Sequence, residues 1–298
     1  MRITWVLLAS LGLVALACGS ETTGEIGSGD SDSDTDTDAD SDTDTDSDTD
    51  TDTDSDGDPL PDAWFLMDAL RIGDTDEGCD IDGDDEVDNQ FSELATFMTD
   101  ESYLDEHPND SIETNIAAGE FLQLVELTEI HSLTDDASLT ASMYEGVLEN
   151  PDAGVPDDLY SGHGSVLVED DAHTVLEEAA IADSHLETPP GEITFTISIN
   201  EIPAEIIIHK ALLEADIDPI PNDEMLEGGL ADGTICGAVD WAELAEMLAL
   251  ELELEPTEQA ALSLYLQSIA DIECEDTDCE QISVGLFFSA VSASVTQP

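Results

Sequence analysis

The chain has 298 residues and a formal net charge of −72, because 75 acidic residues face only three lysines and arginines. Nucleic acids and anionic lipid headgroups are excluded as partners bound through charge, since both are themselves negative. Residues 59–298 alone hold 58 of the acids and two fixed positive charges, Arg71 and Lys210. A folded domain of this composition must tolerate self-repulsion, relieved by salt, by bound cations or by carboxyl groups with raised pKa values.

The first eighteen residues predict a signal peptide. Arg2 provides a positive start, and residues 3–17 provide an apolar core of about fifteen residues, which is too short to span a membrane. The segment ends in Ala15-Leu16-Ala17-Cys18. This ending resembles the lipobox of bacterial lipoproteins, in which the chain is cut before the cysteine and the cysteine receives acyl chains such as palmitate.

The resemblance implies that Cys18 is the lipid attachment site and that the protein is anchored in the bacterial cell envelope, at the outer membrane or the cell surface. Lipoproteins usually carry leucine three positions before the cysteine, where this chain has Ala15. Cleavage by ordinary signal peptidase, or an uncleaved N-terminal helix, therefore stays open as an alternative.

Residues 19–58 predict a disordered acidic tether. Between residues 30 and 58 every second residue is aspartate, and the residues between them are Ser or Thr, apart from Ala39 and Gly57. Such a segment cannot bury enough apolar surface to offset its conformational entropy, and neighbouring charges extend it by repulsion. It resembles the Asp/Ser/Thr linkers of myxobacterial surface lipoproteins. Weak binding of divalent cations and glycosylation of the hydroxyl groups are alternative roles.

An Asp-rich segment at 74–89 has the most specific chemistry of the predicted domain. Its acidic residues alternate, as the side chains of a calcium loop do, with five candidate ligands at positions 1, 3, 5, 7 and 9 of such a loop: Asp80, Asp82, Asp84, Glu86 and Asp88. Alternating carboxylates on a turning backbone converge on one point, which suits Ca²⁺ with its roughly six to eight oxygen ligands. At position 7 the ligand would be the backbone carbonyl.

This segment resembles the calcium repeats of thrombospondin type 3 and dockerin modules. It departs from an EF-hand at two positions, because Asp85 replaces the glycine of position 6 and Phe91 replaces the bidentate glutamate of position 12. We therefore expect modest affinity unless Asp74, Asp76 or another part of the chain completes the ligand shell. The alternative is an acidic loop without a metal.

Four cysteines remain once Cys18 is assigned to lipid. An even number outside the cytoplasm favours two disulfides, and three pairings are possible. We favour Cys274–Cys279 as a short loop closure and Cys79–Cys236 as a link between the front and the rear of the domain. A zinc site is the alternative, but the chain has no Cys-x-x-Cys pair or Cys/His cluster at metal-binding spacing.

Hydrophobic periodicity predicts an α+β fold for residues 59–298, with an antiparallel β-sheet or sandwich and flanking helices. The clearest strand is 193–199, where isoleucine and phenylalanine alternate with threonine and serine. The expected elements, in chain order, are a short helix at 62–70, a helix at 91–98 that ends before Pro108, strands at 121–130, 138–148, 165–169, 193–199 and 204–217, helices from Asp240 and at 257–272, and a closing strand at 284–295.

Catalytic motifs are absent from the sequence: it has no Gly-x-Ser-x-Gly, His-Glu-x-x-His, phosphate loop or dinucleotide fingerprint. We therefore expect a calcium-stabilised binding, adhesion or envelope-organising domain that acts as a monomer on a protein or glycan ligand. A hydrolase is the minority alternative, with a His/acid site at residues 163–185. Its candidate residues are His163, His173 and His185 with Asp170, Asp171 and Glu177. A structural protein without a ligand is a third possibility.

Overall fold

The computed structural model describes residues 59–81, 83, 87–101, 103–199, 202–218, 228–275 and 278–297, except for the side chains of 197–199, 202–204, 273–275 and 278. The described residues belong to one compact unit, Ser55–Pro298. Within these ranges, none of the helices combines the length and the apolar character that crossing a membrane requires.

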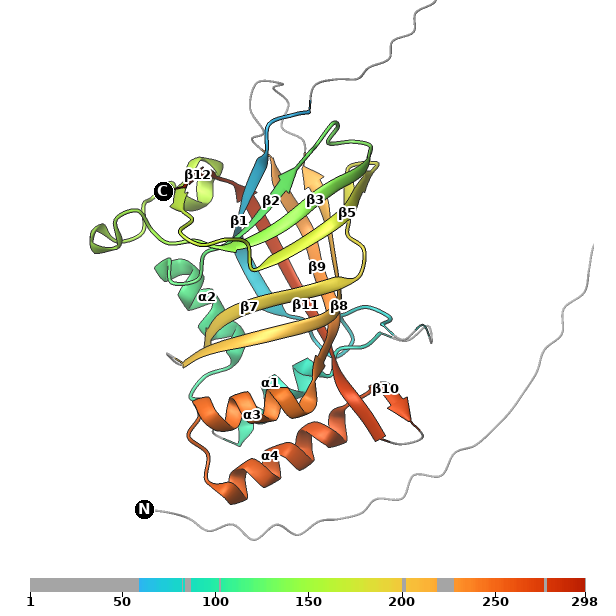
Figure 1. The fold of residues 1–298 in the computed structure, drawn as a ribbon. Coiled ribbons are helices and arrows are strands. Elements are labelled where there is room, and N and C mark those ends of the chain that lie inside the picture. Colours follow the sequence, from blue (N-terminus) through green and yellow to red (C-terminus); the bar gives the residue numbers. More distant parts are fainter. Residues whose placement is uncertain are drawn as a thin grey trace, which may run out of the picture. The chain divides into compact units, whose positions relative to one another are not determined.

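The unit is built on an antiparallel sheet that closes on itself, because β1 pairs with both β2 and β11. Figure 1 shows β1 lying between these two strands. The strands of the closed path follow chain order: β1 (Ala63–Ile72), β2 (Gln123–Thr128), β3 (Asp136–Glu145), β5 (Thr174–Ala182), β6 (His185–Glu187), β8 (Ile202–Asp218), β9 (Gly229–Asp240) and β11 (Asp278–Ser292).

Four further strands extend this arrangement. The hairpin partner of β8 is β7 (Gly191–Ile199), and β10 (Ile272–Glu275) pairs with β11. A small parallel sheet joins β12 (Ser294–Thr296) to β4 (Ser165–Leu167). The predicted strands at 193–199 and 204–217 are therefore confirmed as parts of β7 and β8, and the mainly antiparallel sheet with helices is confirmed as well.

Two hydrophobic clusters stabilise the closed sheet. The larger one fills its interior, where alternate residues such as Val125, Met143 and Val284 are fully or almost fully buried. The smaller one lies on the outer face of β1 and β2, where Leu66 and Leu124 pack against Val166. Strands β1 and β2 are consequently covered on both faces, which removes the alternation of apolar and polar residues that marks a half-buried strand.

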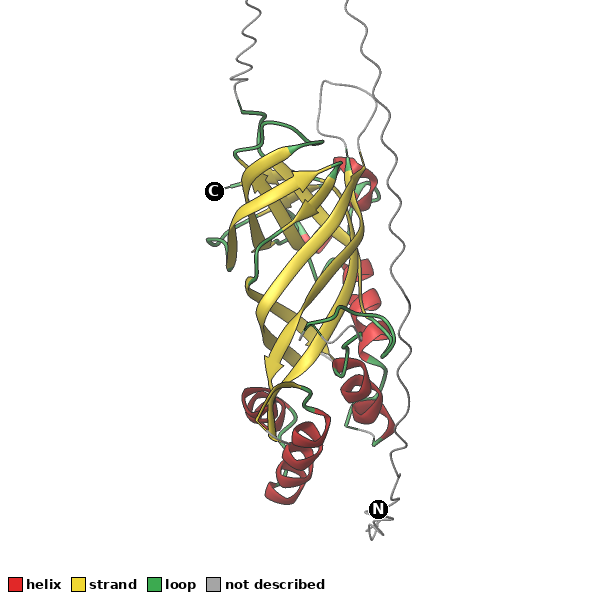
Figure 2. Ribbon diagram, turned by 90° about the vertical axis from the view of Figure 1, so that its right-hand side faces the viewer, coloured by secondary structure: helices red, strands yellow, loops and turns green. Residues whose placement is uncertain are grey.

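Four helices accompany the sheet: α1 (Phe91–Asp100), α2 (Pro108–Ala118), α3 (Trp241–Glu251) and α4 (Pro256–Ile269). Short helical turns occur at Pro151–Ala153 and Leu159–His163. Figures 1 and 2 show α1, α3 and α4 gathered at one end of the sheet, while α2 contacts β1 and β7. The predicted start of α3 is confirmed, because the Asp240 carboxylate accepts hydrogen bonds from the backbone N–H groups of Ala242 and Glu243.

The expected helix at 91–98 is confirmed as α1, whereas one expected element is wrong and helix α2 was not predicted. The segment expected as a helix at 62–70 is strand β1, whose burial on both faces gives a continuous apolar run that periodicity cannot assign. Pro108 does not simply end a helix but begins α2, where the missing N–H of proline costs nothing in the first turn. The ring of His107 caps this helix by accepting from the Asn109 N–H.

Candidate functional site

The candidate site is the loop 73–90, which connects β1 to α1 and contains the Asp-rich segment. Where β1 ends, the Gly73 N–H donates to the Gly285 carbonyl of β11 at 3.0 Å. Further on, the loop doubles back, since Cys79 and Asp88 form an antiparallel bridge with a hydrogen bond of 2.9 Å between the Asp88 N–H and the Cys79 carbonyl. The described residues between 79 and 88 (80, 81, 83 and 87) therefore lie beyond this bridge, at the far end of the loop from its base.

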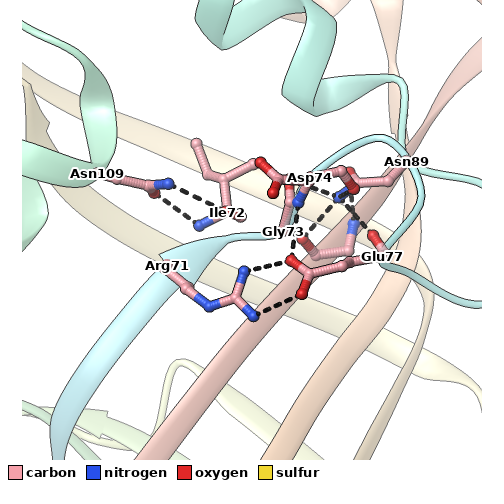
Figure 3. Close-up of polar contacts among 8 residues, drawn as sticks. Arg71, Ile72, Gly73, Asp74, Glu77, Asn89 and Asn109 are labelled. Atoms are coloured by element: carbon pink, nitrogen blue, oxygen red, sulfur yellow. Dashed lines mark hydrogen bonds and ion pairs between the residues drawn. The ribbon is translucent and has the colours of Figure 1, made fainter.

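Asn89 fastens the base of this loop to β11. Its side chain is buried, with 1% of its surface exposed. The Nδ2 amide donates to the carbonyls of Gly73 (3.0 Å), Asp74 (3.2 Å), Glu77 (2.9 Å) and Gly285 (3.3 Å), and Oδ1 accepts from the Gly285 N–H at 3.0 Å. Figure 3 shows this amide at the centre of the turn. One side chain thus connects both halves of the loop to a strand that lies almost two hundred residues later.

Close backbone approach accompanies this network. A Cβ atom on Gly285 would lie 3.0 Å from the Gly78 Cα, and a Cβ atom on Gly78 would lie 2.4 Å from the Asp88 carbonyl oxygen. A real Cβ does not fit at the second distance. Glycine at these positions therefore allows the loop to sit directly on the strand.

Arg71 provides a second fastening at the exposed side of the loop. Its guanidinium forms a two-pronged ion pair with Glu77, with Nη1–Oε2 at 2.6 Å and Nη2–Oε1 at 3.2 Å, and stacks over the Phe287 ring at 4.5 Å. The same Glu77 carboxylate accepts from the Asp74 N–H at 3.1 Å. These hydrogen bonds raise the pKa of Arg71 and lower the pKa of Glu77. Because the pair is exposed, it orients the loop more than it stabilises the fold.

The predicted calcium ligands that the structure describes lie together at the loop tip. Asp80 Oδ1 accepts from the Gly83 N–H at 2.7 Å, and Asp88 Oδ2 accepts from the Ile81 N–H at 3.1 Å. Both carboxylates therefore accept hydrogen bonds from backbone N–H groups of the same short segment, 81–83. The other three candidates, Asp82, Asp84 and Glu86, lie outside the described residues.

The position that would hold the bidentate glutamate of an EF-hand contributes nothing to this tip, because Phe91 is buried in the core at the start of α1. Across the described part of the chain, no group of three or more His, Cys, Asp or Glu side chains is arranged to hold a metal ion.

Cysteines tie the loop to the sheet. The predicted Cys79–Cys236 disulfide is present and connects the loop to β9. Cys279 is also disulfide-bonded, and its cross-strand neighbour in the β10–β11 register is Cys274, whose side chain is outside the described part. The loop is thus fixed by one covalent link and by the Asn89 network.

The three histidines of the alternative hydrolase site do not come together. His173 immediately precedes β5, whereas His185 pairs with the last residue of β5, so the two lie on the order of 30 Å apart at about 3.3 Å per residue. His185 Nδ1 lies 2.8 Å from the Asp216 carboxylate, and His163 is exposed at the end of a short helical turn. Burial lowers the pKa of His173. The accompanying acids, Asp170, Asp171 and Glu177, are exposed.

A cluster on the outer face of the sheet was not predicted. The rings of Trp64 and Tyr144 lie 4.9 Å apart at 46°, and the Tyr144 hydroxyl donates to Glu126 Oε2 at 2.7 Å. Burial raises the pKa of Glu126, although the hydrogen bond from Tyr144 opposes the change, and burial together with Glu126 raises the pKa of Tyr144 to about 12. The cross-strand pairing of Trp64 with Glu126 could have revealed this cluster had β1 been recognised as a strand.

Replacing Glu126 with glutamine is expected to stabilise the protein at pH 7 by about 0.5–1 kcal/mol, because the amide resembles the protonated acid that burial favours. A raised folded-state pKa means that the contribution of Glu126 is fully present below its unfolded-state pKa and is lost as the pH rises through the folded-state value. The gain of Glu126→Gln should therefore disappear near pH 4. Urea unfolding at both pH values measures it, with the exposed Glu177→Gln as the control for general charge removal.

The predicted lipid attachment site Cys18, the predicted signal peptide at 1–18 and the predicted tether at 19–58 lie outside the described residues. No known protein family, characterised protein or solved structure matches the chain. The candidate site is thus an Asp-rich loop whose base is held by one disulfide, one buried amide and one ion pair.

Proposed function

We propose that the chain is a lipid-anchored protein of the bacterial cell envelope whose folded domain binds a protein or glycan ligand and is stabilised by Ca²⁺ at the loop 80–88. The observation that carries the calcium proposal is the fixed base of this loop. Asn89 and the Cys79–Cys236 disulfide hold both of its ends. A loop with fixed ends loses less conformational entropy when its carboxylates gather around an ion.

The ligand chemistry supports calcium in particular. Asp80, Asp82, Asp84 and Asp88 would supply carboxylate oxygens and Glu86 a backbone carbonyl, which is the all-oxygen set that Ca²⁺ prefers. The bound ion would neutralise part of a strongly negative domain, in which Arg71 is already committed to Glu77. Calcium would therefore relieve local repulsion as well as order the turn.

The anchor and the tether complete the proposal. A lipid on Cys18 would attach the chain to the membrane, and the acidic segment 19–58 would hold the domain away from it by extension. The closed sheet with its flanking helices would then present the recognition surface as a monomer. Cationic or neutral ligands suit that surface, because its own charge is strongly negative.

Calcium titration of residues 59–298, followed by thermal unfolding, tests the metal site. A ligand at a hundred times its Kd stabilises the folded state by about 2.7 kcal/mol, which raises the Tm of a domain of this size by roughly 5–10 °C. We expect this rise with Ca²⁺ at millimolar concentration or below. Asp80→Ala and Asp82→Ala should remove most of it.

Two controls separate a site from charge screening. Asp152→Ala removes an exposed acid far along the chain from the loop, and this variant should keep the full response to calcium. Mg²⁺ at equal concentration should have a smaller effect, because it keeps its waters and demands a tighter geometry. An equal rise with Mg²⁺ or with plain salt, unchanged in Asp80→Ala, would show that calcium only screens charge.

The alternative hydrolase has no geometric support among the described residues. A shared His/acid site would require His173 and His185 to approach each other, and they lie at opposite ends of β5. The enzyme interpretation therefore stays a prediction that no specific observation favours.

A further inference from the structure

An apolar cavity of about 40 Å³ lies between α1, α3 and the end of the sheet. Its walls come from all three elements, including Leu94, Ala95 and Met98 of α1, Leu244 and Met247 of α3, and Ile206 of β8. A second cavity of about 20 Å³ shares Ile72, Phe91 and Ile206 with it and continues into the interior of the sheet. The two cavities are therefore neighbouring gaps in the apolar core.

Water is a poor occupant of the larger cavity. One water needs roughly 10–15 Å³ on this measure, together with two to four polar partners, so the space would admit about three waters. Every lining residue except Glu251 is apolar. Such a cavity stays dry, and its natural occupant is an apolar group of a few heavy atoms.

The cavity opens towards α3. Its deeper walls, Leu94, Ala95 and Leu244, are buried, whereas Met247 and Glu251 are half-exposed. Glu251 is the one charged residue in the lining, and no base accompanies it. An anionic headgroup at this opening would meet a carboxylate, while a cationic one would be attracted and a neutral one tolerated. Methionines on facing walls, Met98 and Met247, can adapt to an inserted chain.

We propose that this cavity binds the alkyl end of a neutral or cationic amphiphile. The alkyl group fills the space between α1 and α3, and the headgroup lies at Glu251. The inference goes beyond the proposed function in naming a ligand class, and it does not rest on calcium at the Asp-rich loop. It therefore stands or falls separately from the calcium titration.

The test uses the full-length chain, labelled with ¹³C-methyl methionine, and three decyl probes below their micelle concentrations: decyltrimethylammonium, decyl maltoside and decyl sulfate. We expect the ammonium and maltoside probes to shift the Met98 and Met247 signals saturably while Met143, in the core between β2 and β5, stays unchanged. Decyl sulfate should bind at least tenfold more weakly than decyltrimethylammonium. Equal binding of the anion would overturn the proposed ligand class.

Cavity-filling variants identify the location. Ala95→Leu adds three heavy atoms to the lining and should weaken binding at least tenfold without lowering the Tm, because it fills space that is otherwise empty. Leu244→Phe, which acts from the opposite wall, should do the same if Ala95→Leu does not fold. Leu250→Ala is the matched control, since Leu250 is 73% exposed on α3 outside the lining.

Each result decides the proposal. The proposal is overturned if the cavity-filling variants bind the probes as well as the parent does, or if Leu250→Ala loses binding, because either result indicates adsorption to the surface. It is also overturned if the Met98 and Met247 signals do not shift, because the probes then do not enter the cavity. Glu251→Gln should weaken decyltrimethylammonium several-fold and leave decyl maltoside unchanged. Equal weakening of both probes would remove the assigned role of Glu251 in headgroup preference.

Discussion

Replacing Asn89 with alanine is expected to destabilise the protein by about 3–5 kcal/mol, since it leaves several buried backbone groups without a hydrogen-bond partner. The Gly285 N–H loses its acceptor, and the carbonyls of Gly73, Asp74 and Glu77 lose a shared donor. A cavity at a site that is 1% exposed adds to the cost. Chemical denaturation measures the change in the free energy of unfolding.

Asn89→Asp is the matched variant, because it keeps the shape and the acceptor but places a carboxylate oxygen against the four carbonyl oxygens that now accept from Nδ2. It should be at least as destabilising at pH 7 and should recover part of the loss in acid, where the protonated carboxyl can donate again. Asn109→Ala, which removes two hydrogen bonds to Ile72 in a half-buried position, should cost only about 1–2 kcal/mol. Equal effects of Asn89→Ala and Asn109→Ala would contradict a central role for Asn89.

Removing the Cys79–Cys236 disulfide with paired serine substitutions should cost about 5 kcal/mol in the chain-entropy description. The reason is the separation of 157 residues, which leaves a long loop to be closed in the unfolded chain without the cross-link. Urea unfolding of the double variant, beside the oxidised parent, measures the loss.

A natural comparison is the pair Cys274→Ser and Cys279→Ser at the β10–β11 turn, where the predicted disulfide closes a loop of only a few residues. This second double variant should lose about 2 kcal/mol. If the two double variants lose the same free energy, loop length does not govern the stabilisation. The Cys79→Ser/Cys236→Ser protein should also respond more weakly to calcium, because the Asp-rich turn then retains the Asn89 network as its main fastening.

Sequence patterns predict those strands and helices that have one buried apolar face and one exposed polar face. Ile193 and Phe195 alternate with Thr194 and Thr196, so β7 is visible as a strand, and Asp240 marks the start of α3 through its capping role. Strand β1 lacks this alternation of apolar and polar residues, because the interior core covers one of its faces and the second hydrophobic cluster covers the other. Strand β9 was also not predicted, because its several glycines and alanines give no clear alternation. A Cβ atom on Gly237 would lie 2.6 Å from Ile208 of β8, and one on Gly233 would lie 2.5 Å from the Phe288 ring of β11.

The candidate site likewise contains some residues that the sequence predicts and others that it does not. Its acidic residues and the Cys79–Cys236 pair are recognisable from spacing and count, because those signals are local or involve few residue types. Asn89 has no such signal, since its partners include Gly285, which lies 196 residues away. The contact of Tyr144 with Glu126 likewise depends on a strand register that only the folded sheet fixes.

Closure of the sheet by β1 and β11 has a consequence for how the protein reaches its native state. Asp68 and Ser289 meet across 221 residues, so the last contact of the ring carries a high contact order and forms slowly. Until β11 arrives, β1 and β9 each expose an unpaired edge, which is a template for association with other chains. The excess negative charge of residues 59–298 keeps such intermediates apart by mutual repulsion. The acidity of this chain thus protects it during the delay that its own topology imposes.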